Sequence, residues 1–301
     1  MSDQADSTLP AARSPANSKV LLALLAVYLI WGSTYLGTRI AVQSFPPFSL
    51  GGVRYLLAGG ALYGVLRHRG APPPRRSEWL AALFVGVLLL GLGNGLTSLA
   101  LVTVSSGVVA IVIATTPLWS VAFASLWGAR PVRLELIGLG LGLAGVYTLQ
   151  RGGAFAGSAV GLWVALVASL TWALGSVWSG RLPRPAGMMT SAVQMLAGGA
   201  SMLAIGVARG ERVGVVTTAA VLAFVYLVVF GSVVAFTAYQ FLLVSTRPAL
   251  ATSYAFVNPV IALLLGALVA DEALSVHHFV ACGLTVLAVV CVLRARVSVT
   301  A

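Results

Sequence analysis

Ten long apolar runs, separated by short polar loops, decide what this chain can fold into. An α-helix of about 20 apolar residues crosses a bilayer core, and the backbone inside the core must pair its own polar groups. The runs are therefore predicted to be transmembrane helices, and the chain is predicted to be an all-α integral membrane protein. They cover residues 20–40, 50–66, 79–101, 107–127, 134–149, 159–179, 188–207, 219–244, 249–270 and 276–293.

The charge content supports a membrane protein and argues against several partners. Charged residues make up 8% of the sequence and hydrophobic residues 59%, whereas soluble domains carry about 25% charged residues. The formal net charge of +11 could indicate nucleic-acid binding, but the basic residues lie in short loops between apolar runs, where they orient membrane proteins. No Gly-x-x-x-x-Gly-Lys-Ser/Thr loop for nucleotide phosphates is present. The lipid bilayer is therefore an expected partner, and nucleic acid and nucleotide are not.

The basic residues also predict the orientation of the chain. With both termini cytoplasmic, 13 Lys and Arg residues fall in cytoplasmic segments and 4 in outer loops, which is the bias that multi-pass proteins of the cell (inner) membrane show. The last of the 18 basic residues, Arg54, lies inside the second run. Residues 1–18 are polar and are predicted to form a disordered cytoplasmic N-terminus.

An internal repeat divides the chain into two halves. The segment Leu57-Ala58-Gly59-Gly60 recurs at residues 196–199, Trp31 pairs with Trp172, and Pro117 pairs with Pro259, at offsets of 139, 141 and 142 residues. Each half therefore has five helices, in residues 20–149 and 159–294, and residues 150–158 form the linker. An odd helix number places the second half upside down in the membrane. Such inverted repeats surround the central cavity of alternating-access carriers.

Several segments together form a recognisable family pattern: Trp31-Gly32-Ser33-Thr34-Tyr35 and residues 53–59, 93–95, 114–119 and 249–260. In these segments the chain resembles the EamA family of the drug/metabolite transporter superfamily, in particular its inner-membrane exporter branch. The resemblance implies ten helices and export of amino acids, metabolites or toxic compounds through a central cavity. One departure concerns Leu101, since this branch often has an acidic residue at that place.

Tyr254 and Asn258 are the first candidates for the wall of such a cavity. They are four residues apart and share one helix face, beside the Ala255 carbonyl that Pro259 leaves without an N–H partner. An unpaired polar group in hydrocarbon costs several kcal/mol, so this face must meet other helices or a wet cavity. The alternative is that Asn258, and Thr116 before Pro117 in the first half, only bond the carbonyls that the prolines free.

Other side chains inside the runs could also bind a substrate. The two tryptophans could form aromatic walls or simply pack. Arg54 could be functional, as charges within a membrane usually are, or could extend to the outer headgroups. The remaining candidates carry uncharged polar groups in mid-run, and their spacing does not show which of them face the cavity. The complete set of predicted substrate-binding residues is Trp31, Tyr35, Arg54, Asn94, Thr116, Trp172, Gln194, Tyr239, Gln240, Tyr254 and Asn258.

These features predict a secondary transporter that exports small metabolites, amino acids or drug-like compounds by alternating access. A structural or sensory multi-pass membrane protein is the alternative. An enzyme is not expected, because all seven acidic residues lie outside the helix interiors and no histidine lies within one. No cofactor or metal is expected. Spacings such as Gly60-x-x-x-Gly64 indicate close helix packing and leave a homodimer open.

Overall fold

The computed structural model describes the chain apart from residues 1–14, 105–108, 110–111, 151–157, 262–275 and 298–301. The described part is built of helices, and each of the ten apolar runs contains helical residues. The helices of the first half are α1 (Pro15–Ala41), α2 (Pro47–His68), α3 (Arg76–Gly86), η1 (Val87–Asn94), α4 (Gly95–Thr103), α6 (Thr116–Leu126) and α7 (Arg133–Gln150). Those of the second half are α8 (Ala159–Ser179), α9 (Met189–Ala208), α10 (Thr218–Tyr226), η2 (Leu227–Val234), α11 (Ala235–Ser245), α12 (Pro248–Ala251) and α14 (Val276–Val297), with a further helical stretch at residues 254–261.

Five of the described helices are long and apolar enough to cross a membrane. They are Ser18–Thr38, Arg76–Thr103, Ala159–Ser179, Met189–Ala208 and Thr218–Ser245. The helical architecture predicted from the apolar runs is confirmed for the described residues, and the total of ten crossings stays a prediction. Helix α1 begins at Pro15, inside the stretch 1–18 that was predicted to be disordered, and the rest of that stretch lies outside the described residues. Most of the predicted linker also lies outside them.

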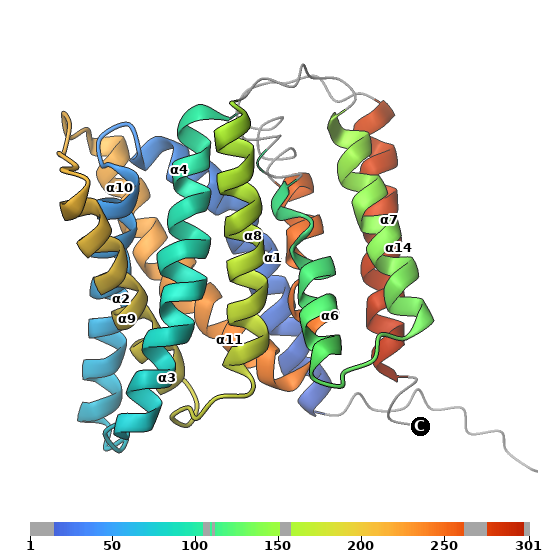
Figure 1. The fold of residues 1–301 in the computed structure, drawn as a ribbon, viewed down its shortest axis with the longest axis horizontal. Helices are drawn as coiled ribbons and strands as arrows, with labels where there is room; N and C mark the ends of the chain where they lie inside the picture. The colour runs from blue at the N-terminus through green and yellow to red at the C-terminus, as the bar shows by residue number, and fades with distance from the viewer. Residues whose placement is uncertain (1–14, 105–108, 110–111, 151–157, 262–275, 298–301) are drawn as a thin grey trace, which may run out of the picture.

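The helices pack in pairs that match the internal repeat. Helix α2 packs on α9, α7 on α14, and α6 on α12; α1 packs on the continuous helix of α10, η2 and α11, as α8 does on that of α3, η1 and α4. Figure 1 shows the first two pairs at opposite edges of the bundle. Helices α2 and α9 run antiparallel, because Gly52 lies against Leu203 while Gly59 lies against Ala192. Each pairing is preserved when the two halves are exchanged.

Glycines allow α2 and α9 to approach closely. A Cβ atom on Gly59 would lie 2.9 Å from the Ala192 carbonyl oxygen, and one on Gly199 would lie 2.8 Å from the Leu56 nitrogen. These two glycines belong to the repeated sequence segment. Gly60 and Gly64 are different, since a Cβ atom on either would meet nothing within 4 Å. That spacing therefore makes no close helix contact within the described part of the chain.

Two π-helical segments interrupt the long helices at equivalent places. Each has eight residues, and η2 begins 140 residues after η1. This offset aligns Gly91 with Gly231. A π-helical turn is wider than an α-helical turn and is frequently found at functional sites. The repeat therefore extends to a backbone irregularity that the apolar pattern did not predict.

An ion pair joins the start of α7 to the start of α12. Arg247 donates from Nη2 to Glu135 Oε2 at 2.8 Å and from Nε to Glu135 Oε1. Its Nη2 also donates to the Arg130 carbonyl oxygen at 2.9 Å, and the Val132 N–H donates to Glu135 Oε2 at 3.1 Å. The Glu135 side chain is 3% exposed and that of Arg247 26% exposed. A buried carboxylate thus depends on one arginine 112 residues away.

The loop after α9 fixes the start of α2. The Glu211 carboxylate accepts the N–H groups of Phe48, at 3.2 Å, and Ser49, at 2.7 Å. Pro47 occupies the first turn of α2, where no intrahelical N–H bond is lost. A negative charge at a helix N-terminus is stabilising, because the free N–H groups and the helix dipole both favour it. Glu211 therefore fixes the first turn of α2, and this in turn fixes the position of Arg54 along the helix axis.

Candidate functional site

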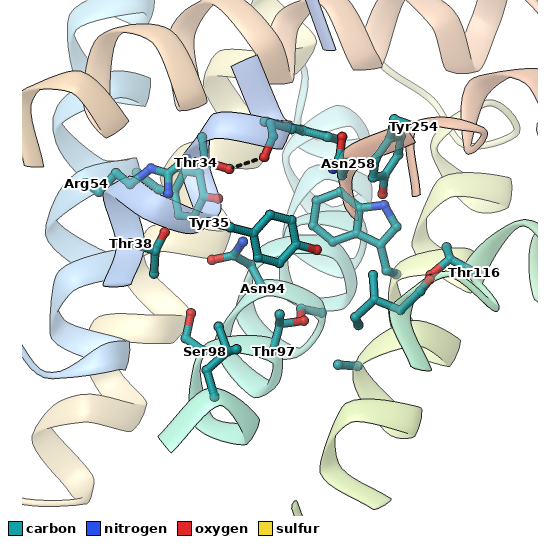
Figure 2. Close-up of a pocket in the computed structure, with 17 residues that line it drawn as sticks. Thr34, Tyr35, Thr38, Arg54, Asn94, Thr97, Ser98, Thr116, Tyr254 and Asn258 are labelled. Carbon is teal, nitrogen blue, oxygen red and sulfur yellow. Dashed lines mark hydrogen bonds between the residues drawn. The ribbon is translucent and has the colours of Figure 1, made fainter. Parts of the chain in front are cut away.

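A cavity lies between α1, α2, η1, α4, the start of α6, α8 and the helical residues 254–261. It contains about 740 Å³ of space, part of which is open to solvent. Figure 2 shows polar side chains directed toward this space from several helices. Eight of the eleven predicted binding residues line it: Trp31, Tyr35, Arg54, Asn94, Thr116, Trp172, Tyr254 and Asn258. Most of the residues predicted from the sequence therefore line one cavity, although they come from helices far apart in the chain.

Other lining residues were missed although their spacing follows the helical period. Thr34 and Thr38 share a face of α1 with Trp31, and Thr97 and Ser98 follow Asn94 by three and four positions. Residues three and four apart lie on one helix face, so these could have been found from their neighbours. Leu101 also lines the cavity. The place where the resembled branch often has an acid thus faces this space with an apolar side chain.

Three predicted residues lie away from the cavity, in a buried polar network. The Tyr239 hydroxyl accepts the Trp172 indole N–H at 3.0 Å and lies 2.5 Å from the Ser176 hydroxyl. The Gln240 side-chain oxygen accepts the Ser179 hydroxyl at 2.7 Å, and the Ser179 hydroxyl accepts from Gln194 at 3.1 Å. Gln194, Tyr239 and Gln240 do not line the cavity. Their observed contacts connect α8, α9 and α11, and Tyr239 holds the ring of one cavity tryptophan.

An aromatic cluster forms one boundary of the cavity. The Trp31 ring centroid lies 4.7 Å from that of Tyr254, 5.0 Å from that of Tyr239 and 5.6 Å from that of Trp172. The Trp31 indole N–H donates to the Gly231 carbonyl oxygen in η2 at 3.0 Å. Three of these rings line the cavity, and Trp31 and Tyr239 each contact the other three rings, so the tryptophans both line the cavity and pack in the cluster. Edge-to-face pairs of this kind contribute about 0.5–1.5 kcal/mol each beyond their area burial.

Asn258 and Thr116, which are equivalent in the repeat, make different hydrogen bonds. The Thr116 hydroxyl donates to the Ile113 carbonyl oxygen at 2.6 Å, which is the carbonyl that Pro117 leaves free. The alternative interpretation of its sequence position therefore holds for Thr116, although the residue also lines the cavity. Asn258 is 3% exposed, and its side-chain oxygen has no hydrogen-bond partner among the described residues. Its amide is thus uncommitted at the cavity wall.

Arg54 is the charged residue of the described cavity wall. Its Nε donates to the Ser232 hydroxyl at 2.7 Å, and its guanidinium carbon lies 4.8 Å from the centroid of the Tyr55 ring. The residue is 6% exposed, so protein encloses the side chain, which argues against a guanidinium that extends to headgroups. Among the described residues, no group of three His, Cys, Asp or Glu side chains could hold a metal ion. The chemistry available here is binding by one cation, amides, hydroxyls and aromatic rings.

Comparison with known proteins gives matches over most of the chain. Residues 18–150 and 159–294 each match the EamA-like transporter family. The chain is 43% identical over 272 residues to the uncharacterized inner membrane transporter YedA of Escherichia coli K12, covering 90% of this chain and 89% of that protein. It is 30% identical over 165 residues to the uncharacterized transporter YvbV of Bacillus subtilis, covering 53% and 54% of the two chains. Among the solved structures that share the fold is a crystal structure with a TM-score of 0.76 and 23% identity, whose match covers 92% of this chain and 98% of the other.

Proposed function

This chain belongs to the EamA-like transporter family, and from that premise we propose that it exports small metabolites, amino acids or drug-like compounds by alternating access. It is a membrane transport protein with several apolar helices, related to inner membrane transporters. The direction, the class of cargo and the mechanism are the proposal. A secondary carrier needs a binding space in the membrane interior that each side of the membrane reaches in turn.

One observation carries the proposal: a cavity with polar walls lies among apolar helices. Its polar groups come from α1, α2, η1, α4 and the helical residues 254–261, and they include an uncommitted amide and a buried guanidinium. Unpaired polar groups among apolar helices cost several kcal/mol each. Such groups persist where a ligand or water bonds them. We propose that the eight lining residues predicted from the sequence contact the cargo.

The proposed architecture is ten helices in two inverted five-helix repeats around this cavity, in residues 20–149 and 159–294. Three findings support it. The helix pairs are preserved when the halves are exchanged, α2 and α9 run antiparallel, and the π-helical segments are 140 residues apart. Two similar halves that meet at one cavity can rock against each other and open it to either side.

The proposed orientation places both termini in the cytoplasm. The lining residues Thr38 and Leu101 lie near the ends of α1 and α4, and Arg54 lies near the start of α2. The cavity therefore extends toward the end of the bundle where α1 stops and α2 begins. With the bias of Lys and Arg in the loops, that end is the outer side. The described conformation would then face outward, with the aromatic cluster on the cytoplasmic side of the cavity.

Counterflow in proteoliposomes tests the proposal. Purified protein is reconstituted into vesicles preloaded with one member of a panel of L-amino acids, monocarboxylates and cationic dyes, and entry of the same labelled compound is followed. Wild type should show saturable exchange with at least one probe. Asn258→Ala should reduce that exchange by about tenfold, the effect of losing roughly one hydrogen bond to a polar ligand.

Thr285→Ala is the matched control for this assay. Thr285 is also 3% exposed and its hydroxyl also lacks a partner among the described residues, but it does not line the cavity. Its exchange rate should stay near that of wild type. If monodisperse wild-type protein exchanges no probe, the chain is better explained as a structural or sensory membrane protein. If Asn258→Ala and Thr285→Ala lose exchange equally, Asn258 supports the folded structure and does not contact the cargo.

A further inference from the structure

Arg54 is a buried cation to which the described part of the chain offers no carboxylate. The three acidic residues that the structure describes have other partners. Glu78 accepts a backbone N–H at the start of α3, Glu135 pairs with Arg247, and Glu211 binds the start of α2. A buried charge without a counter-charge costs several kcal/mol. An arginine that is kept in such a place is expected to meet its counter-charge on a ligand.

The guanidinium is held in a defined orientation. Its Nε donates to the Ser232 hydroxyl at 2.7 Å, and that hydroxyl donates to the Leu227 carbonyl oxygen at 3.1 Å. The guanidinium carbon lies over the Tyr55 ring, 4.8 Å from its centroid. Neither terminal nitrogen has an acceptor among the described residues, and Arg54 is part of the cavity wall. One edge is thus fixed by the protein and the terminal N–H groups remain available.

The π-helical segment η2 makes room for this arrangement. A Cβ atom on Gly231 would lie 2.6 Å from Nη2 of Arg54. The next residue, Ser232, supplies the acceptor for Nε and is fully buried. The Gly231 carbonyl oxygen also accepts the Trp31 indole N–H at 3.0 Å. The same turn therefore positions the cation and one ring of the aromatic cluster.

We propose that Arg54 binds the carboxylate of the transported molecule, so that the cavity selects small molecules with one carboxylate group. The planar guanidinium matches a carboxylate with two parallel N–H bonds. A phosphate group would carry about two negative charges, and the described wall has one cation to balance them. This inference rests on the proposed function of the same cavity.

The rest of the wall accommodates the remainder of such a molecule. Figure 2 shows Arg54 at the left of the labelled group and Asn258 to its right, beside Tyr254, with the Tyr35 ring between Arg54 and Asn258 in this view. Trp31, Trp172 and Tyr254 offer aromatic faces, which attract apolar groups and ammonium groups alike. A zwitterionic amino acid or an apolar monocarboxylate therefore meets complementary chemistry at both ends.

Binding of matched acids and amides tests the proposal. Purified protein is titrated with L-amino acids and monocarboxylates, each paired with its primary amide, which keeps the size and removes the charge. Tryptophan fluorescence reports binding because Trp31 and Trp172 line the cavity. In wild type, at least one acid should bind about 10- to 100-fold more tightly than its amide, as expected for a hydrogen bond to a charged group.

Variants of Arg54 should change this preference in graded steps. Arg54→Gln should bind the acid no more tightly than the amide. Arg54→Lys should bind the acid more weakly than wild type but keep some preference, because an ammonium group has the charge without the planar fork. Ser232→Ala should lower the ratio of acid to amide affinity while leaving amide binding unchanged, which is the result for a positioning residue. Arg69→Gln, an exposed arginine at the end of the same helix, is the control and should match wild type.

Three results would overturn the proposal. They are equal binding of acids and amides to wild type, a retained acid preference in Arg54→Gln, and no acid binding to monodisperse wild-type protein. If Arg54→Gln does not fold, the ratio of acid to amide affinity is measured in Arg54→Lys and Ser232→Ala instead, and an unchanged ratio in both overturns the proposal. If proteoliposomes exchange amides as fast as acids, the carboxylate site is contradicted and the transport function is not. If acids bind but are not exchanged, the transport function is contradicted and the carboxylate site is not.

Discussion

Replacing Gly59 by leucine is expected to reduce the folded protein in the membrane to below about a tenth of the wild-type level. A Cβ atom at this position would lie 2.9 Å from the Ala192 carbonyl oxygen and from the Leu196 nitrogen. Both are backbone atoms and cannot rotate away, so the added side chain must push α2 from α9. Adding side-chain atoms to a packed core costs about 1–3 kcal/mol when the neighbouring side chains can shift. Separating two helices along their length costs more, which is a large part of a total stability of about 5–15 kcal/mol.

Gly60→Leu is the matched control for this prediction. It adds the same side chain one residue further along the same helix, where a Cβ atom meets nothing within 4 Å. Its level and its profile in fluorescence-detected size-exclusion chromatography should stay near those of wild type. Equal levels of the two variants would contradict the tight α2–α9 contact. An altered oligomeric state of Gly60→Leu would instead indicate that this face joins two copies of the chain.

Replacing Arg247 by methionine is expected to destabilise the protein by about 3 kcal/mol. The change leaves the Glu135 carboxylate buried with the Val132 N–H as its remaining partner in the described structure. Breaking a buried ion pair by removing one partner costs about 3–5 kcal/mol, and the partial exposure of Arg247 favours the lower end of this range. Thermal unfolding in detergent should show a melting temperature several degrees below that of wild type.

The double variant Glu135→Leu/Arg247→Met separates charge from packing. Removing both partners leaves no buried charge, so at least half of the lost stability should return. A double variant as unstable as Arg247→Met would show that the arginine acts through packing. The pair could not be predicted from the sequence, because Glu135 lies at the start of the fifth apolar run, outside the helix interior, and its partner is 112 residues distant.

The sequence predicted elements more successfully than contacts. Apolar length identified the helical runs, and the Tyr254–Asn258 spacing identified a face that lines the cavity. The π-helical segments were missed because a glycine-containing apolar run has the same composition in either helix type. Tyr239 and Gln240 were assigned to the cavity although the structure packs them against α8. In a helix with polar residues at adjacent positions, sequence alone does not show which neighbour each one meets.

Arg54 illustrates the same limit at the candidate site. Its position in the second run suggested either a functional charge or a side chain extending to headgroups. Its contact with Ser232, 178 residues away, places the side chain inside the protein, and its role in binding stays a prediction. Thr116 and Asn258 were treated as equivalent from the repeat, yet Thr116 bonds the carbonyl freed by its proline and Asn258 does not. The repeat equates the two positions but does not supply the contacts of each side chain, and those contacts differ.

Cysteine accessibility at Ser98 tests the central claim most directly, because alternating access requires one cavity residue to be reached from both sides of the membrane. Ser98 is 9% exposed and lines the cavity. Ser98→Cys is introduced after Cys282 and Cys291 are replaced by alanine, with Thr285→Cys as the control outside the cavity. A membrane-impermeant thiol reagent should label Ser98→Cys in both right-side-out and inside-out vesicles, more slowly when a transported probe is saturating, and should leave Thr285→Cys unlabelled. Labelling of Ser98→Cys from one side only, with or without the probe, would contradict a carrier that opens this cavity to each side in turn.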